Sequence, residues 1–225
     1  MVTTTQGIEH QVEIPSGRQR LSGILRVPPG AEGVIAFAHG SGSGRFSPRN
    51  QFVARALEEG GLATLLLDLL EDEEAEDREK VFDIELLAER LQSAADWLRQ
   101  EPQTRELRLG YFGASTGAGA ALVAAASNST AVSAVVSRGG RPDLASGHLS
   151  AVQAPTLLIV GGEDCVVIGL NEQAYRRLHC PKEMVIVPGA THLFEEPGTL
   201  EEVARLAKEW FVRHLVGKER KTVES

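Results

Sequence analysis

The sequence predicts an α/β fold, a three-layer α/β/α sandwich with a mostly parallel, twisted sheet of about eight strands. Apolar runs of strand length alternate with amphipathic stretches of helix length along the 225 residues, as in a sheet covered by helices on both faces. Several of these runs are apolar throughout, which is typical of strands buried on both faces. The sequence has no internal repeat and no linker, so we expect a single domain over 1–225 with a frayed tail at 216–225.

The strands are predicted from short apolar runs bounded by glycine, proline or polar residues. We expect the first two to form an antiparallel hairpin around Pro15-Ser16-Gly17, and most of the others to be parallel strands. The predicted strands cover 10–14, 21–27, 33–39, 63–70, 107–114, 131–137, 155–162 and 183–189.

The predicted helices lie between these strands. Ser47 and Pro48 suit the cap and the first position of a helix that ends near Gly60. Residues 82–100 carry leucine and alanine on one stripe at helical spacing, and a final amphipathic helix follows the last strand. The acidic run 71–77 is predicted to be a solvated loop.

Composition excludes several classes of partner. The formal net charge of −8 argues against nucleic acid and anionic membranes, because both need clustered lysine and arginine. Two cysteines imply no disulfide framework, and no apolar run reaches the length that spans a bilayer. The first residues lack the apolar core of a signal peptide, so we expect a cytoplasmic protein.

The segment Gly113-Ala114-Ser115-Thr116-Gly117 has the form G-x-S-x-G, which marks a sharp strand-to-helix turn carrying a nucleophile. Small residues are needed two positions before and after the serine, because neighbouring backbone passes close to the turn. LRLGYF precedes the motif as a predicted strand, and TGAGAALVAAA follows it as a predicted helix. Ser115 is therefore the predicted nucleophile.

A serine needs an oriented base to react at neutral pH. His192 follows the last predicted strand, which places it above the sheet, and it is the predicted base. Asp164 follows the strand before that one and is the predicted carboxylate that orients the base. Glu163 and Asp143 remain open as alternatives. The order Ser115, Asp164, His192 along the chain is more specific than any one motif.

Acyl transfer also needs hydrogen-bond donors aimed at the developing oxyanion. The backbone N–H of Thr116, directly after the nucleophile, is the first predicted donor. The second is predicted in the glycine-rich loop HGSGSG, at Ser41 with Gly42 as the alternative. His39 opens this loop and is predicted to be structural, with its ring hydrogen-bonded locally. The loop lacks the G-K-[ST] ending of a phosphate-binding loop.

Five residues are candidates for substrate binding, and Gly42 is one of them. Arg138 and Arg141 lie just after a predicted strand and could clamp a substrate carboxylate in bidentate fashion. The alternative, which we favour, is a structural pairing with Asp143 or the acidic run. Cys165 and Leu193 could line the pocket. A buried, inert role is the alternative for Cys165, and core packing is the alternative for Leu193.

The segments FAHGSGSGR, GYFGASTGAG, VVSRGGRPDL, LLIVGGED and VPGATHLFEEPG give the chain a resemblance to the α/β-hydrolase superfamily over nearly its whole length. It is most similar to the small, lidless, dienelactone-hydrolase-like branch. SRGGRPDLA and PGATHLFEEPG resemble segments of hydrolases that are sometimes fused to phosphoribosyltransferase domains. The resemblance implies a serine-hydrolase triad and ester substrates. Dienelactone hydrolases use a cysteine where this chain has Ser115, which favours general carboxylesterase chemistry.

The predicted function is hydrolysis of a small-molecule carboxylic ester through an acyl-enzyme, with no cofactor and no metal. The same triad could serve an acyltransferase or a perhydrolase, and the same fold could serve a non-catalytic ligand-binding protein. A peptidase would carry an added cap or propeller, and the stretch 139–154 is too short for a large cap. We expect a monomer or a homodimer.

Overall fold

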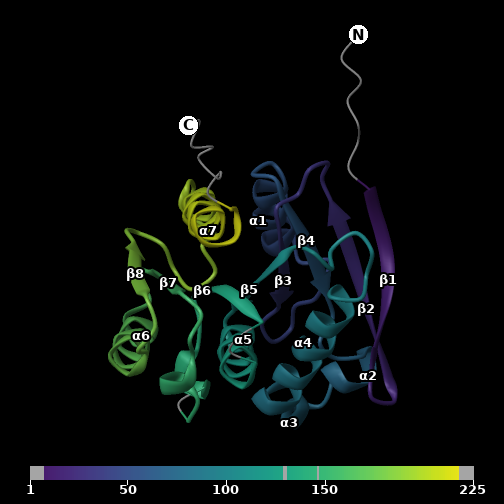
Figure 1. The fold of residues 1–225 in the computed structure, drawn as a ribbon. Coiled ribbons are helices and arrows are strands. Elements are labelled where there is room, and N and C mark those ends of the chain that lie inside the picture. The colour runs from purple at the N-terminus through teal and green to yellow at the C-terminus, as the bar shows by residue number, and fades with distance from the viewer. Residues whose placement is uncertain (1–7, 129–130, 146, 218–225) are drawn as a thin grey trace, which may run out of the picture.

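One eight-stranded sheet organises the fold, in the order β1-β2-β4-β3-β5-β6-β7-β8. The computed structural model describes residues 8–128, 131–145 and 147–217. Strands β3 to β8 are parallel to one another, whereas β1 pairs with β2, and β2 with β4, in the antiparallel sense (Figure 1). The strands are β1 (Ile8–Ser16), β2 (Gln19–Val27), β3 (Gly33–Ala38), β4 (Leu62–Leu67), β5 (Arg108–Ala114), β6 (Val132–Arg138), β7 (Thr156–Gly161) and β8 (Lys182–Val187).

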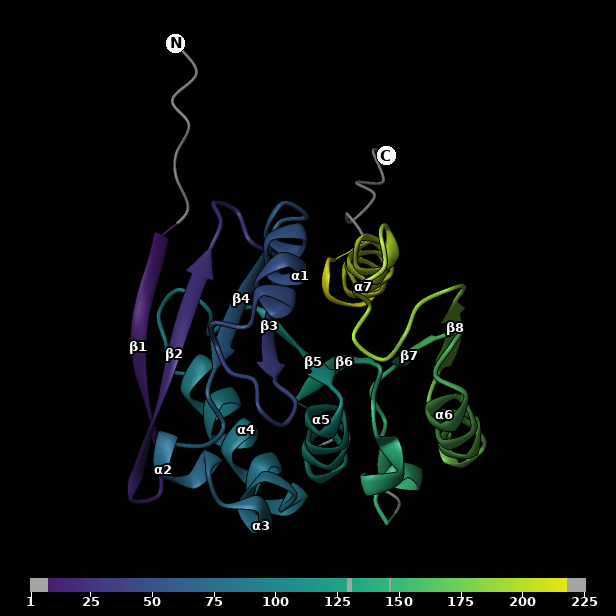
Figure 2. The same ribbon diagram turned by 180° about the vertical axis from the view of Figure 1, so that it is seen from behind.

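Helices cover both faces of the sheet, so the predicted three-layer fold is confirmed. Helices α1 and α7 pack on one face of the sheet, and α4, α5 and α6 pack on the other (Figure 2). Each face has its own apolar core. In the described part of the chain, no helix is both long and apolar enough to cross a bilayer. The helices are α1 (Pro48–Glu58), α2 (Asp72–Ala75), α3 (Arg78–Val81), α4 (Ile84–Leu98), α5 (Thr116–Ser127), α6 (Cys165–Arg177) and α7 (Thr199–Leu215), with short 3₁₀ turns at Pro142–Ala145 and Leu149–Ala151.

The strands follow the apolar pattern of the sequence closely. β3, β4 and β7 are buried along their full length, as continuous apolar runs predict. The predicted hairpin is present, and its turn places Gly17 at φ 60°, a conformation that glycine adopts without strain. The predicted strand 63–70 stops at Leu67 because the chain leaves the sheet toward α2, although Leu69 and Leu70 are still buried.

The ends of two helices test further predictions. Helix α1 begins as predicted, with Asn50 N donating to Ser47 Oγ at 3.4 Å and Pro48 in the first position. Helix α7 ends at Leu215. Most of the tail predicted at 216–225, from position 218 onward, lies outside the described residues.

The acidic run 71–77 is solvent-exposed as predicted except at Glu74, but the prediction that it is a loop is wrong. Part of it forms α2, and Glu74 on this helix is buried. Arg90 on α4 donates to both carboxylate oxygens of Glu74, at 2.5 and 2.8 Å, and Lys80 donates to the same carboxylate at 3.1 Å. The residue that holds α2 therefore lies 16 positions away in the sequence, where a local charge pattern could not reveal it.

Glu74 makes the stability of the fold depend on pH. Hydrogen bonds from Arg90 lower the pKa of Glu74 from 4.5 to about 2. The unfolded chain therefore takes up this proton first as the pH falls. The contribution of Glu74 is complete above about pH 5 and is lost as the pH falls from about 4.5 toward 2. It amounts to about 3 kcal/mol, because one pKa unit corresponds to about 1.4 kcal/mol.

We expect the difference in unfolding free energy between the wild type and Glu74→Gln to shrink by about 2 kcal/mol between about pH 7 and about pH 3. Urea unfolding at the two pH values measures it. Glu76→Gln, which changes an exposed carboxylate beside the same helix, is the matched control and should show no such change. Equal pH dependence of the wild type and Glu74→Gln would contradict the assignment.

The carboxyl ends of the parallel strands meet at one edge of the sheet. The loops that follow β3, β5, β6, β7 and β8 therefore gather there, and each carries residues predicted for the site. The fold brings together residues that are separated by up to about 150 positions in the sequence.

Candidate active site

Ser115 occupies the tight turn between β5 and α5 that the sequence predicts. Its backbone has φ 50° and ψ −120°, which is strained for a residue with a side chain. The two glycines of the motif are required sterically. A Cβ at Gly113 would lie 2.4 Å from Ala118 Cα, and one at Gly117 would lie 2.2 Å from the Ala38 carbonyl oxygen. Backbone packing on both sides thus fixes the turn.

The turn is also braced by hydrogen bonds to the end of β6, to the loop after it and to helix α5. Ser115 N donates to the Arg138 carbonyl at 3.3 Å, and the Ser115 carbonyl accepts from Arg141 N at 3.0 Å and Ala118 N at 3.1 Å. These contacts satisfy the backbone groups of a strained residue and hold its side chain at the end of the sheet.

Asp164, His192 and Ser115 form a hydrogen-bonded chain. His192 Nδ1 lies 2.6 Å from Asp164 Oδ2, and His192 Nε2 lies 3.4 Å from Ser115 Oγ. Because the carboxylate can only accept, Nδ1 carries the proton and Nε2 is free to accept from the serine hydroxyl. The predicted alternatives are placed elsewhere. Asp143 pairs with Arg141, and Glu163 is exposed.

The loop that carries His192 is held by a carboxylate that the sequence analysis did not identify. Glu196 accepts from Thr191 N at 3.0 Å and from Thr191 Oγ1 at 2.6 Å, and these hydrogen bonds lower the pKa of Glu196. Phe194, which is buried, turns the chain with φ 56°. The available signal was the segment THLFEEPG, in which a threonine precedes two glutamates. Residue spacing alone does not show which glutamate accepts hydrogen bonds from the threonine.

The glycine-rich loop after β3 packs directly on the turn that carries Ser115. A Cβ at Gly40 would lie 3.0 Å from Ser115 Cβ. The Ser41 amide, the predicted second oxyanion donor, reaches the site, but here it donates to Thr116 Oγ1 at 3.1 Å. Gly42, the alternative, has φ 68° and lines an outer cleft instead of the pocket around Ser115.

His39 is the structural residue that the sequence predicts. Its Nε2 accepts from Leu69 N at 2.9 Å, so Nδ1 carries the proton and donates to the Gly40 carbonyl at 2.9 Å. Burial lowers the pKa of His39, which keeps the ring neutral. One imidazole thus joins the glycine-rich loop to the end of β4.

Replacing His39 by alanine is expected to lower the unfolding free energy by about 2–4 kcal/mol, because the Leu69 N–H and the Gly40 carbonyl both lose their partner. Urea unfolding measures the change. His10→Ala, which truncates an exposed histidine in β1, is the control and should fall within about 0.5 kcal/mol of the wild type. A loss below about 1 kcal/mol for His39→Ala would mean that water replaces the ring.

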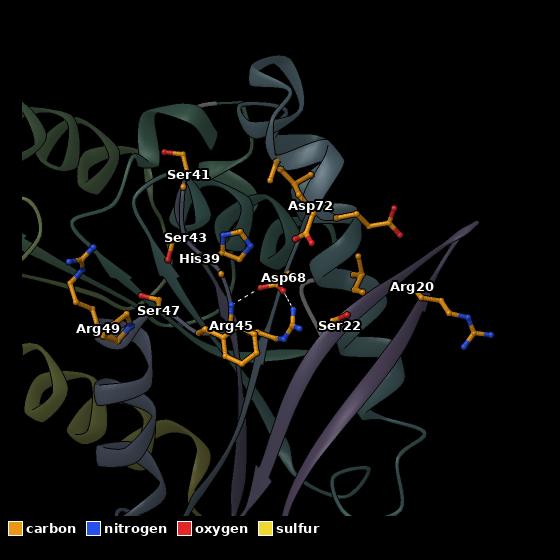
Figure 3. Close-up of a pocket in the computed structure, with 18 residues that line it drawn as sticks. Arg20, Ser22, His39, Ser41, Ser43, Arg45, Ser47, Arg49, Asp68 and Asp72 are labelled. Atoms are coloured by element: carbon orange, nitrogen blue, oxygen red, sulfur yellow. Dashed lines mark hydrogen bonds and ion pairs between the residues drawn. The ribbon is translucent and has the colours of Figure 1, made fainter.

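A pocket of about 160 Å³ surrounds Ser115 and His192. It adjoins a polar cleft of about 750 Å³, because both are lined by Ser41, Ser43, Ser47 and Arg49. Figure 3 shows this cleft. His39 lies between the glycine-rich loop and the ion pair that Arg45 forms with Asp68. The sequence analysis missed Arg49 in the pocket wall. Its position in the first turn of α1, a helix that follows a parallel strand, was the available signal.

The five candidate substrate-binding residues separate clearly, and Gly42 lines the outer cleft. Arg138 and Leu193 line the pocket around Ser115. Arg141 does not, and its guanidinium instead forms two hydrogen bonds of 2.8 Å with Asp143, the structural alternative. Cys165 is exposed at the first position of α6 and lines no part of this pocket, so both interpretations of it were wrong.

Comparison with known proteins identifies the family of this chain. The sequence model of the dienelactone hydrolase family matches residues 33–215. This chain belongs to the dienelactone hydrolase family. The match runs from β3 through α7, so it includes every parallel strand together with Ser115, Asp164 and His192. The family is one of α/β hydrolases, and the chain accordingly has that fold.

Solved structures place the chain among other members of this fold. The crystal structure of a dienelactone hydrolase from Anabaena variabilis is 57% identical, has a TM-score of 0.90 and covers 93% of this chain and 99% of its own. Est1E from Butyrivibrio proteoclasticus is 16% identical with a TM-score of 0.78 over 90% of this chain and 98% of its own, which is a likeness of fold alone.

Curated relatives are longer than this chain. Two Mycobacterium tuberculosis proteins, each named "Putative phosphoribosyl transferase", are 56% identical over 209 residues. The matched region is 93% of this chain but 47% of each relative, so the chain spans about half their length. The hydrolase family therefore accounts for the half that the proteins share.

Proposed function

We propose that this protein hydrolyses carboxylic esters of small molecules through an acyl-enzyme formed on Ser115. The observation that carries the proposal is the hydrogen-bonded chain from Asp164 through His192 to Ser115, at a strained turn that opens into a pocket. The Anabaena variabilis relative is named a dienelactone hydrolase, and a lactone is a cyclic ester. Both points favour acyl transfer from an ester to water.

In the first half-reaction, Ser115 Oγ attacks the ester carbonyl carbon while His192 Nε2 takes the hydroxyl proton. The carbonyl oxygen becomes an oxyanion, the alcohol oxygen then leaves with the proton from His192, and an acyl group remains on Ser115. Asp164 accepts from Nδ1 throughout, which keeps the imidazole in the productive tautomer and stabilises the imidazolium.

The oxyanion is bound by backbone amides in this proposal. Thr116 N opens helix α5, where the helix dipole favours negative charge. Ser41 N supplies the second hydrogen bond, with the substrate oxygen taking the place of Thr116 Oγ1 as its acceptor. The free enzyme thus keeps this amide satisfied until the oxyanion forms.

In the second half-reaction, water enters from the adjoining cleft and His192 removes its proton. The hydroxide attacks the acyl carbonyl, the acid leaves, and the proton returns to Ser115. In the described part of the chain, no three His, Cys, Asp or Glu side chains gather as a metal site would require. The proposed mechanism uses no metal ion.

A fluorophosphonate probe tests the proposal directly. We expect stoichiometric labelling at Ser115 in the wild-type protein, because the probe reacts with an activated serine and mimics the tetrahedral intermediate. Mass spectrometry of the labelled peptide locates the site. Ser127→Ala, at the far end of α5, is the control and should label like the wild type.

The same experiment separates the competing functions. Absence of labelling would favour a non-catalytic binding protein and overturn the proposal. Labelling together with hydrolysis of 4-nitrophenyl acetate supports it. Faster transfer of the acyl group to added alcohols or peroxide than to water would assign the labelled serine to an acyltransferase or a perhydrolase.

A further inference from the structure

The cleft that adjoins the pocket around Ser115 is much larger than the entry of water requires. It measures about 750 Å³, within the range of about 300–1,000 Å³ that is typical of ligand sites, whereas the pocket measures about 160 Å³. One water molecule occupies about 30 Å³ in the liquid, so the pocket has room for only about five heavy atoms. The two spaces therefore suit the two parts of an ester of unequal size.

The proposed mechanism indicates which part of the ester lies in each space. The acyl group becomes bonded to Ser115 Oγ, and Ser115 lines the small pocket. The alcohol must leave before water can attack the acyl-enzyme, and the cleft is the larger space next to the pocket. We therefore expect a short acyl group in the pocket and the alcohol group in the cleft.

The charges that line the cleft cancel. In the described part of the chain, its walls hold three arginines and three carboxylates, and Arg45 and Asp68 form an ion pair with each other. A charged ligand would meet groups of both signs, so this lining favours a neutral one. The six residues are Arg20, Arg45, Arg49, Asp68, Glu71 and Asp72.

The lining is rich in hydrogen-bonding groups of both kinds. Serine hydroxyls donate and accept, guanidinium groups donate, and carboxylates accept. An alcohol hydroxyl also does both, so a ligand with several hydroxyl groups matches this wall. Figure 3 shows Ser41, Ser43 and Ser47 on one side of Asp68, with Ser22 on the other.

Phe46 adds one exposed aromatic ring to this polar cleft. Its side chain is 62% exposed, whereas the leucines of the lining, Leu21 and Leu70, are buried. The Arg45 guanidinium carbon lies 4.4 Å from the centre of the Phe46 ring, and the ion pair with Asp68 holds Arg45 in place. The ring is thus positioned before a ligand arrives, which lowers the entropy cost of binding.

We propose that this cleft binds a neutral alcohol group with several hydroxyls, of the size of a sugar ring, packed on Phe46. The inference rests on the proposed function and deepens it, since it makes the substrate a short-chain acyl ester of a polyol. The C–H groups of a sugar ring pack on the negative face of an aromatic ring, while its hydroxyls bond to the polar wall. Phe46 is the specificity-determining residue.

Binding to Ser115→Ala tests the cleft without turnover. Two acetates of similar shape, methyl 6-O-acetyl-α-D-glucopyranoside and cyclohexylmethyl acetate, would be titrated and followed by NMR. We expect the sugar acetate to bind about tenfold more tightly, the effect of one or two net hydrogen bonds. Equal binding, or tighter binding of cyclohexylmethyl acetate, overturns the inference.

Turnover by the wild type tests which side of the ester lies in the cleft. The kcat/KM of each ester, divided by its rate constant for hydrolysis by hydroxide, removes differences in intrinsic reactivity. We expect the sugar acetate to exceed both cyclohexylmethyl acetate and the methyl ester of methyl α-D-glucuronoside by about tenfold or more. The glucuronoside has its sugar on the acyl side, so faster turnover of that ester overturns the inference.

Variants of Phe46 locate the effect. Phe46→Ala in the Ser115→Ala background should weaken binding of the sugar acetate about 3- to 10-fold, and Phe46→Trp should retain it. Phe82→Ala is the matched control, because Phe82 is also exposed and also lies near an arginine, Arg78, but lines no part of the cleft. Unchanged binding in Phe46→Ala, or an equal loss in Phe82→Ala, overturns the role of Phe46.

Failure of this inference can be told apart from failure of the proposed function. Labelling of wild-type Ser115 by the fluorophosphonate, together with equal binding of the two acetates, overturns the inference alone. Tighter binding of the sugar acetate without labelling supports the cleft as a polyol site and overturns the proposed function alone.

Discussion

Replacing Ser115 by alanine is expected to lower kcat/KM for an activated ester by about 10⁴-fold or more. The substitution removes the hydroxyl oxygen that lies 3.4 Å from His192 Nε2, and with it the proposed acyl-enzyme pathway. Some acceleration over water should remain from the oxyanion donors. Steady-state hydrolysis of 4-nitrophenyl acetate, with circular dichroism as a check on folding, measures the loss.

The presteady state gives a sharper version of the same test. The wild type should release a burst of nitrophenol equal to the enzyme concentration if deacylation is slower than acylation. Ser115→Ala should release none, whereas Ser127→Ala should behave as the wild type. If the activity of Ser115→Ala stays within about tenfold of the wild type, another residue is the nucleophile.

Replacing Asp164 by asparagine is expected to lower kcat by about 10³- to 10⁴-fold, the second-largest effect. Asparagine can donate from its amide to His192 Nδ1, at the position where the carboxylate accepts at 2.6 Å. The ring proton then sits on Nε2, which can no longer accept the proton of Ser115. The geometry is kept while the tautomer is reversed.

Kinetics of Asp164→Asn with the same ester, beside its neighbour variant, checks this expectation. Glu163→Gln changes an exposed carboxylate adjacent in sequence and should stay within about twofold of the wild type. A large loss of kcat in Glu163→Gln with a small loss in Asp164→Asn would assign the carboxylate that orients His192 to Glu163.

The nucleophile turn could be predicted from sequence because its determinants are local. Gly113 and Gly117 lie within two residues of Ser115. A Cβ at Gly113 is excluded by the backbone of the motif and of Ala118 beside it, and a Cβ at Gly117 by the carbonyl of Ala38 at the end of β3. Chain order then identified Asp164 and His192, because parallel strands deliver their loops to one edge of the sheet. Strands β3, β4 and β7 could be predicted from continuous apolar runs, since burial on both faces leaves such a pattern.

Other features depend on contacts that no local pattern records. The acidic run 71–77 was misassigned because Arg90, which buries Glu74, lies on another helix. Arg138 and Arg141 look alike in the sequence, yet one enters the pocket and the other turns to Asp143. The two side chains point in different directions, and the spacing of residues in the sequence does not encode that difference.

The bracing of Ser115 also bears on when the protein becomes reactive during its own synthesis. The turn is held by Ala38 before it and by Arg141 after it, and the base arrives only with His192, near the end of the described chain. A growing polypeptide that has exposed Ser115 therefore carries an ordinary alcohol, because nothing yet withdraws its proton. In the proposed mechanism, activation of Ser115 therefore requires the folded arrangement that brings Asp164 and His192 to it.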